Sequence, residues 1–237
     1  MNGLGAALEE VDRLKALVAA GPEPKGEIAV CPPATLLFGA SARLKGSGIA
    51  SGGQDCHPAV SGAHTGDISA AMLADAGARF VIVGHSERRA DHHETDDLVA
   101  AKARAAVWAG LVPIICVGET LEQRRGGVAE GVVSTQLAKS IPAEVQNAEF
   151  VVAYEPIWAI GSGIRATSED IIDMHATIRS RLAERFGDPG AQARILYGGS
   201  MKPANAAEIL ALPEVNGGLI GGASLLSVDF YAIISAL

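Results

Sequence analysis

Short apolar runs alternate with longer segments of helical periodicity along the whole chain. The apolar runs predict seven strands, over Glu27–Cys31, Gly48–Gly52, Phe80–Val83, Val112–Val117, Phe150–Tyr154, Arg194–Tyr197 and Gly217–Ile220. The segments between them predict eight helices, near Ala6–Ala20, Ala34–Leu44, Ala70–Ala76, Asp96–Ala109, Val132–Ser140, Ser168–Phe186, Ala204–Leu210 and Leu225–Ala236. Strands that alternate with helices at this spacing predict an α/β protein with a parallel sheet covered by helices.

The length and composition favour one domain over residues 1–237. The chain has 237 residues, and α/β barrels commonly form one domain of about 200–250 residues. Its residues are 49% hydrophobic but only 4% aromatic, as expected for strands buried on both faces. No segment has the composition of a linker.

The first predicted element is a helix, whose apolar residues include Leu4, Leu8, Val11 and Leu14. A closed barrel of eight strand–helix units would need one more strand before Met1. The expected fold is therefore a (β/α)8 barrel that lacks its first strand.

Charge and cysteine content exclude several classes of protein. A formal net charge of −8 argues against a nucleic-acid or anionic membrane surface. The three cysteines have no CxxC or zinc-type spacing, and no run of 18 apolar residues or signal peptide is present. These features predict a cytoplasmic protein with reduced thiols, no metal site and no membrane association.

Two predicted strands end on titratable side chains. The run Val81–Val83 is followed by Gly84-His85-Ser86-Glu87, and the run Val151–Tyr154 is followed by Glu155 and Pro156. Parallel barrels carry their catalytic groups at this carboxyl rim of the strands. An imidazole and a carboxylate placed there suit moving a proton next to a carbonyl group.

Three turns of small residues could bind a phosphate through backbone N–H groups. They are Gly161-Ser162-Gly163, Gly198-Gly199-Ser200 and Gly221-Gly222-Ala223-Ser224. The last two follow the final two predicted strands, where barrels often hold phosphate. Backbone donors would let an acidic protein bind an anion without an arginine cluster.

Seven motifs, in order along the chain, resemble the triosephosphate isomerase family. They are Gly53-Gln54-Asp55-Cys56-His57, Gly62-Ala63-His64-Thr65-Gly66-Asp67, Val83-Gly84-His85-Ser86-Glu87-Arg88, Cys116-Val117-Gly118-Glu119, Tyr154-Glu155-Pro156-Ile157-Trp158-Ala159-Ile160-Gly161, Tyr197-Gly198-Gly199-Ser200 and Gly221-Gly222-Ala223-Ser224-Leu225. The resemblance implies an aldose–ketose isomerase that interconverts dihydroxyacetone phosphate and D-glyceraldehyde 3-phosphate, as in glycolysis and gluconeogenesis, without metal or organic cofactor.

The same resemblance assigns roles to residues of this chain. Glu155 would be the base and His85 the electrophile, with Ser86 and Glu87 beside them. A closing lid would span 156–167, with Ile160 capping the base. The implied substrate-binding residues are Gly161, Ser200, Leu219, Gly221 and Gly222, together with Ile160.

The resemblance also implies a homodimer. The loop Gln54–Asp67 would project into a neighbouring subunit, with Thr65 reaching the partner's active site and Gln54 at the start of the loop. Each subunit would then both insert and receive a loop.

One departure from the family pattern leaves a second hypothesis open. The family's first strand ends in Gly-Asn-Trp-Lys-Met-Asn-Gly, and this chain begins at Met-Asn-Gly, so the family's catalytic lysine is missing. The alternative is a truncated, weakly active or inactive barrel that binds phosphate ligands or self-assembles. An aldolase is disfavoured, because no predicted strand ends on a lysine that could form a Schiff base.

Two further signals receive structural interpretations. The segment Asp91-His92-His93-Glu94 resembles a metal site in composition, but adjacent histidines point to different sides, so a solvated helix start is expected. Cys116 ends an apolar strand and is expected to be a buried structural thiol.

Overall fold

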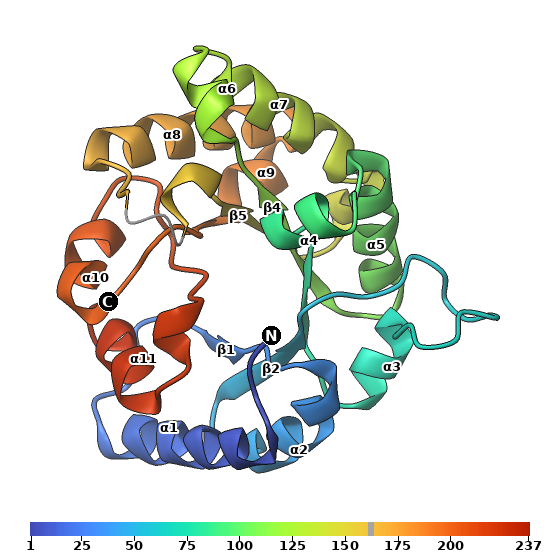
Figure 1. Cartoon of the computed structure of the whole chain (residues 1–237), viewed down its shortest axis with the longest axis vertical. Coiled ribbons are helices and arrows are strands. Elements are labelled where there is room, and N and C mark those ends of the chain that lie inside the picture. The colour runs from blue at the N-terminus through green and yellow to red at the C-terminus, as the bar shows by residue number, and fades with distance from the viewer. Residues whose placement is uncertain (161–163) are drawn as a thin grey trace.

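A computed structural model describes residues 1–160 and 164–237. Its centre is a parallel sheet of six strands, in which each strand pairs with the next along the chain. The strands are β1 (Ile28–Val30), β2 (Ile49–Gly53), β3 (Phe80–Val83), β4 (Val112–Val117), β5 (Val151–Tyr154) and β6 (Arg194–Tyr197). Figure 1 shows the strands around a central axis with the helices outside them.

The helices follow the strands in alternation. The α-helices are α1 (Leu8–Ala20), α2 (Ala34–Leu44), α3 (Ala70–Asp75), α4 (Ser86–Asp91), α5 (Asp96–Trp108), α6 (Leu121–Arg125), α7 (Ala129–Ser140), α8 (Ser168–Phe186), α9 (Asp188–Gln192), α10 (Pro203–Leu210) and α11 (Ser227–Ile234). The described residues also form short 3-10 helices, η1 (Gly5–Ala7), η2 (Ala143–Asn147), η3 (Ile157–Ala159) and η4 (Gly222–Ser224). No described helix is both long and apolar enough to cross a membrane.

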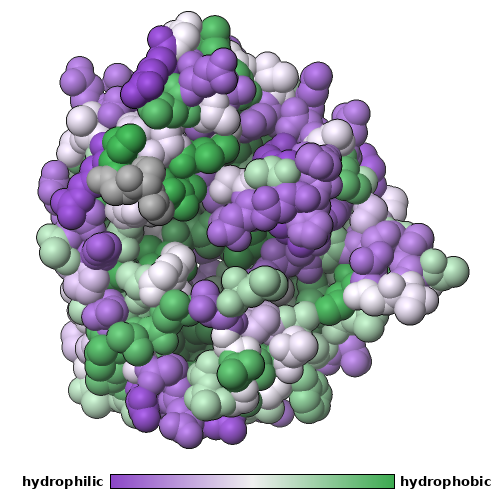
Figure 2. Space-filling model, viewed as in Figure 1, coloured by the Kyte–Doolittle hydropathy of each residue, from purple (hydrophilic) through white to green (hydrophobic). Residues whose placement is uncertain are grey.

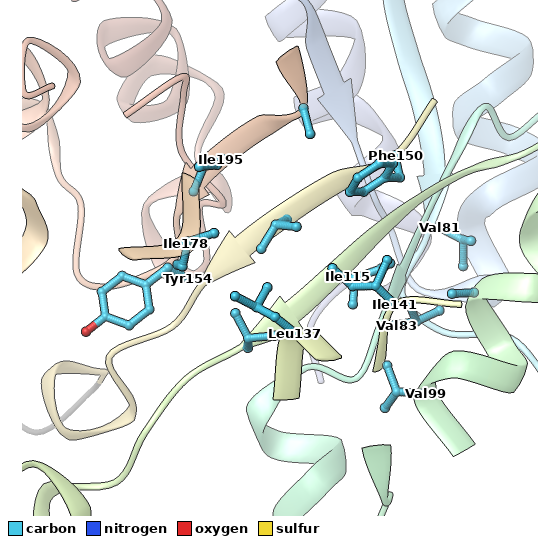
Figure 3. Packing of buried hydrophobic residues seen from close by; sticks show 14 of the residues in the cluster. Val81, Val83, Val99, Ile115, Leu137, Ile141, Phe150, Tyr154, Ile178 and Ile195 are labelled. Atoms are coloured by element: carbon cyan, nitrogen blue, oxygen red, sulfur yellow. The ribbon is translucent and has the colours of Figure 1, made fainter. Parts of the chain in front are cut away.

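Alternation along the strands divides the core into two layers. One set of strand side chains packs against the surrounding helices, and Figure 3 shows Val81, Val83, Ile115 and Ile195 of this layer, with Ile178 of α8 near Ile195. The other set fills the inside of the curved sheet, and consists of Phe80, Ile82, Val112, Ile114, Cys116, Val151 and Ala153. Since successive strand residues face opposite sides, Glu155, two positions after Ala153, is directed to the inner face.

The first and last helices lie side by side and join the two ends of the chain (Figure 1). The carboxylate of Glu10 in α1 accepts hydrogen bonds from both the backbone N–H and the hydroxyl of Ser227, the first residue of α11, at 2.8 and 2.7 Å. A separate apolar cluster lies beneath these helices, made of Val11, Leu14, Ile28, Ala40, Leu44, Ile49 and Ile234.

The prediction of a seventh strand over Gly217–Ile220 is wrong. This segment forms one isolated bridge, between Tyr197 and Gly218, supported by a hydrogen bond from the Leu219 N–H to the Tyr197 carbonyl at 2.9 Å. Gly217 has a φ of +155°, so the backbone leaves the extended conformation just before the bridge. Within the described residues, no strand pairs with the free edge of β1, which would be needed to continue the ladder.

Most other elements agree with the sequence prediction, and β3, β4 and β6 begin and end where predicted. The sequence prediction missed α4, α6 and α9, which have five or six residues each. Helices this short show less than two turns of apolar periodicity, so the pattern carries little signal for them.

His175 of α8 is a fully buried polar group behind β5 and β6. Its Nδ1 lies 3.0 Å from the carbonyl oxygen of Glu214, and its ring lies edge-on to Tyr154 with the ring centres 5.8 Å apart. Burial lowers the pKa of this imidazole from 6.5 to about 4, so it is neutral in the folded protein at neutral pH.

This burial predicts a loss of stability in mild acid. Because the unfolded chain takes up a proton on His175 near pH 6.5 and the folded chain only near pH 4, the free energy of unfolding falls as the pH decreases between these values. The expected contribution is on the order of 3 kcal/mol. Urea unfolding of His175→Asn, which keeps a donor for the Glu214 carbonyl, should show a smaller decline over this pH range than the parent. The exposed His92→Asn should retain the parent's decline, and equal declines in all three proteins would contradict the assignment.

Candidate active site

The ends of β3 and β5 bring an imidazole and a carboxylate together. After β3, Gly84 turns the chain with a φ of +68°, and His85 becomes the N-cap residue of α4. After β5, Glu155 continues the ladder for one residue, because its N–H donates to the Val117 carbonyl of β4 at 2.8 Å. The result is a distance of 3.0 Å between His85 Nε2 and Glu155 Oε1.

The Glu155 carboxylate is held by three donors. The Ser86 N–H donates to Oε2 at 2.9 Å, the Ser86 hydroxyl donates to Oε1 at 3.0 Å, and His85 is the third partner. The Glu155 side chain is 2% exposed, whereas that of His85 is 28% exposed. The thiol of Cys116 also lies against this carboxylate from the neighbouring strand.

One hydrogen bond of His85 indicates which tautomer its uncharged ring adopts. Its Nδ1 accepts a hydrogen bond from the Glu87 N–H at 3.3 Å, in the first turn of α4. A ring nitrogen that accepts a hydrogen bond carries no proton, so the neutral ring has its proton on Nε2, the atom that faces Glu155. In this tautomer His85 donates a hydrogen bond from Nε2.

Burial tunes the carboxylate toward the strength of a general base. Desolvation raises the pKa of Glu155, while His85 and the two donors of Ser86 act in the opposite direction. A raised pKa makes the carboxylate a better proton acceptor, and the donors keep it from becoming permanently protonated.

Two glycines allow the backbone to pack closely around Glu155. A Cβ on Gly118 would lie 1.8 Å from the carbonyl oxygen of Glu155, and a Cβ on Gly198 would lie 2.9 Å from its Cγ. Gly118 is also fixed from behind by Gln136 of α7, whose side-chain amide accepts from its N–H at 2.7 Å and donates to its carbonyl at 3.0 Å. The backbone at the end of β4 thus supports that of Glu155.

The segment after Glu155 is tied to β4 through a buried carboxylate. Glu119 accepts hydrogen bonds from the Trp158 indole of η3 at 2.8 Å, from the Tyr154 hydroxyl at 3.1 Å and from Arg124 at 3.1 Å. The Arg124 guanidinium also stacks on the Trp158 ring. Sequence reasoning missed Glu119 as a site component, although it sits in a recognisable motif directly after β4.

The predicted phosphate-binding residues lie on the loops that follow the last strands. Ser200 lies two residues after Gly198, and Leu219 follows the bridge to Tyr197. Gly221 and Gly222 are exposed at the start of η4. Among the hydrogen bonds of the described residues, none joins these groups to Glu155 or His85. Gly161 lies outside the described residues, and Ile160 is half-buried just after η3.

Figure 2 shows the same side of the molecule as Figure 1, and α4 faces the viewer there. The surface is hollowed near its centre, with hydrophobic residues in the hollow and hydrophilic residues gathered beside it over α4. Glu87 is exposed in the first turn of that helix.

The loop between β2 and α3 projects from the body of the protein (Figure 1). Gln54 stays attached at its base, because its side-chain amide donates to the Cys31 carbonyl at 2.9 Å, whereas Thr65 is exposed. In the described part of the chain, the one group of potential metal ligands is His57, His64 and Asp67, whose ligand atoms lie within 4.8 Å of one another.

The hydrogen bonding of His57 does not favour a metal. Its Nδ1 accepts from the Ala59 N–H at 3.0 Å, so the proton of the neutral ring is on Nε2, which faces Asp67 at 3.6 Å. A metal-binding histidine instead donates from its second nitrogen.

The expectation of a solvated helix start over Asp91-His92-His93-Glu94 is wrong. Asp91 is the last residue of α4 and the other three follow it, so the segment ends a helix instead of starting one. Asp91, His92 and His93 are exposed, and His93 has a φ of +55°. Glu94 is buried, and its carboxylate accepts from Lys102 at 2.5 Å and from Arg88 at 2.7 Å. A charged residue is expected to be solvated from sequence alone, and only the fold supplies these two cations.

The fold and the site together define the class of protein. A parallel α/β sheet surrounded by helices, with a buried carboxylate and an imidazole at the carboxyl ends of its strands, is the scaffold of the barrel enzymes that transfer protons. The family model for triosephosphate isomerase matches residues 1–237. The chain belongs to the triosephosphate isomerase family.

Individual relatives and a solved structure agree. The chain is 60% identical over 233 residues to the triosephosphate isomerase of Hyphomonas neptunium, covering 98% of this chain and 93% of that protein. It is 59% identical to the triosephosphate isomerase of Afipia carboxidovorans, covering 100% and 94%. The crystal structure of triosephosphate isomerase from Bartonella henselae superposes with a TM-score of 0.92 at 47% identity, covering 100% of this chain and 94% of the other. These matches favour an isomerase over the alternative of an inactive barrel that only binds phosphate ligands.

The close approach at Gly118 predicts a large effect from one methyl group. Because the new Cβ would overlap a backbone oxygen that cannot move aside alone, Gly118→Ala should lower the free energy of unfolding by on the order of 3 kcal/mol. Gly131→Ala in α7 is the matched control, since nothing lies within 4 Å of its added Cβ, and it should leave stability unchanged or raise it by up to about 1 kcal/mol. Urea denaturation measures both, and equal stabilities would contradict the packing argument.

Proposed function

We propose that this protein interconverts dihydroxyacetone phosphate and D-glyceraldehyde 3-phosphate. The observation that carries the proposal is the buried Glu155 carboxylate, 3.0 Å from the Nε2 atom of His85. Membership of the family supplies the substrate class, and the geometry supplies a base and a hydrogen-bond donor side by side.

In the proposed mechanism, Glu155 removes a proton from the carbon next to the substrate's carbonyl group. Electrons from the broken C–H bond form the carbon–carbon double bond of an enediolate, and the carbonyl oxygen gains negative charge. His85 then donates its Nε2 hydrogen bond to that oxygen instead of to Glu155. Glu155 then gives its proton to the former carbonyl carbon. At the same time the hydroxyl proton of the neighbouring carbon moves to the charged oxygen by way of His85 Nε2, which gives one proton and takes one back. The neighbouring oxygen becomes the new carbonyl oxygen, and no cofactor is needed.

Ser86 has the role of holding the base in this scheme. Its backbone N–H reaches one carboxylate oxygen and its hydroxyl the other, so the carboxylate keeps its orientation when His85 leaves it. Such fixed donors need no rearrangement during the reaction. Glu87 contributes through its backbone, by holding the tautomer of His85.

We assign substrate binding to the loops at the same ends of the strands. The phosphate group would be bound by backbone N–H groups of Gly161, Ser200, Gly221 and Gly222, with Leu219 beside the substrate. Support comes from the position of these turns after β5, β6 and the bridge at Gly218. The lid would span 156–167 and close Ile160 over the base, excluding water from the enediolate.

Replacing the base tests the proposal. Glu155→Gln removes the proton acceptor but keeps the shape and one hydrogen-bond acceptor, so turnover of glyceraldehyde 3-phosphate should fall by about three orders of magnitude. Binding of a phosphate-bearing substrate analogue should change little, because the carboxylate does not contact the phosphate in this scheme.

Glu130→Gln is the control, since Glu130 is exposed on α7, and it should leave turnover unchanged. A parent protein that binds the analogue without turning over substrate would refute the proposed function. Equal losses of turnover and analogue binding in Glu155→Gln would refute the role of Glu155 alone.

We also propose that the protein is a homodimer joined through the loop of residues 54–67. This loop projects from the body in Figure 1, and Val60 within it is exposed, as is Met72 of the adjacent α3. A projecting segment with exposed apolar side chains can bury them against a second copy.

The three cysteines are free, in keeping with the cytoplasmic location expected from the sequence.

The dimer can be tested at the tip of the loop. Sedimentation velocity should give twice the 24.3 kDa mass of the chain for the parent protein. Thr65→Arg should weaken the dimer at least tenfold, since a buried and unpaired guanidinium is costly at an interface. Thr135→Arg, which is exposed on α7, should remain as dimeric as the parent. A monomeric parent, or an unaffected Thr65→Arg, would contradict this interface.

A further inference from the structure

Arg89 is a largely buried arginine directly beneath the catalytic pair. It lies in the last turn of α4, and its side chain is 14% exposed. All three of its guanidinium nitrogens are engaged, by two backbone carbonyls and two side chains of other elements.

The two carbonyl groups belong to the strand ends that carry the site. Arg89 Nε donates to the Gly84 carbonyl at 2.9 Å, and Nη2 donates to the Cys116 carbonyl at 3.1 Å. Gly84 immediately precedes His85, and the Cys116 thiol lies against the Glu155 carboxylate. One planar group therefore links the peptide before the imidazole to the peptide beside the base.

The guanidinium is in turn fixed from the outer helices. Its Nη1 pairs with Asp96 at 2.7 Å, at the start of α5, and Nη2 donates to the Ser140 hydroxyl at 2.9 Å, at the end of α7. The Ser140 hydroxyl itself donates to Asp96 at 2.9 Å, so the three side chains form a closed ring of hydrogen bonds. Because each side chain in this ring is bonded to the other two, the guanidinium is held in a single orientation.

We propose that Arg89 is a positioning residue that sets the separation of His85 and Glu155. It does not touch the substrate, and it acts through the backbone of Gly84 and Cys116. This inference rests on the proposed isomerase function of the same site. A lysine cannot replace it, because an ammonium group lacks the planar fork that reaches both carbonyls while it pairs with Asp96.

The test is Arg89→Lys, with turnover and the Michaelis constant measured separately. A shift of the two catalytic groups relative to each other should lower kcat on the order of 10- to 100-fold. KM should stay within about twofold, because the phosphate-binding turns are not attached to Arg89. The acid limb of the kcat/KM profile should also move, since the surroundings of the Glu155 carboxylate change.

Arg88→Lys is the matched control on the same helix. Arg88 pairs with Asp55 at 2.9 Å and with Glu94 at 2.7 Å, and among the described contacts it reaches neither strand carbonyl. At protein concentrations that keep the dimer intact, its kcat should remain within about twofold of the parent.

If Arg89→Lys does not fold, Ser140→Ala tests the positioning role of Arg89 instead. It removes one hydroxyl from the ring and should lower kcat several-fold with KM unchanged. The inference is overturned if the folded Arg89→Lys keeps the parent's kcat, if Arg88→Lys loses as much, or if Ser140→Ala has no effect. A parent without isomerase turnover would instead refute the proposed function, which the same assay shows separately.

Discussion

The burial of one carboxylate governs the arrangement of the site. Glu155 is 2% exposed at the end of a strand, where an unpaired charge would be strongly disfavoured. Its charge is tolerated because Ser86 contributes two donors and His85 a third. The Ser86 N–H is available because α4 begins at Ser86, shortly after β3, and the first N–H groups of a helix have no partner within it.

Close backbone packing makes this arrangement rigid. Gly118 and Gly198 flank Glu155 on the neighbouring chain segments, at distances that exclude any side chain. Gln136 satisfies both polar groups of the Gly118 peptide, and thereby connects the end of β4 to α7. The outer helices are therefore more than a cover for the sheet, because their polar side chains fix the peptides on which the catalytic groups depend.

Buried polar groups recur around the strand ends, and each is paired with side chains of neighbouring elements. Glu119 accepts hydrogen bonds from side chains of β5, η3 and α6, and Glu94 accepts hydrogen bonds from Lys102 and Arg88. In a low-dielectric interior such pairs hold the elements in one register, since removing either partner leaves a charge without compensation. The loops at this end of the sheet are thus well connected, although loops ordinarily have few fixed contacts.

The sequence by itself determined the parallel α/β class, three strands to the residue, and the two strand ends that carry His85 and Glu155. Periodicity and strand-end chemistry are local properties, and they can be read without knowing the fold. Only the tertiary structure decided that Gly217–Ile220 forms a single bridge, that Glu94 is buried, and that Arg89 spans two strand ends. Pairing partners, burial of charge and the reach of a guanidinium depend on segments far apart in the chain, so no local pattern contains them.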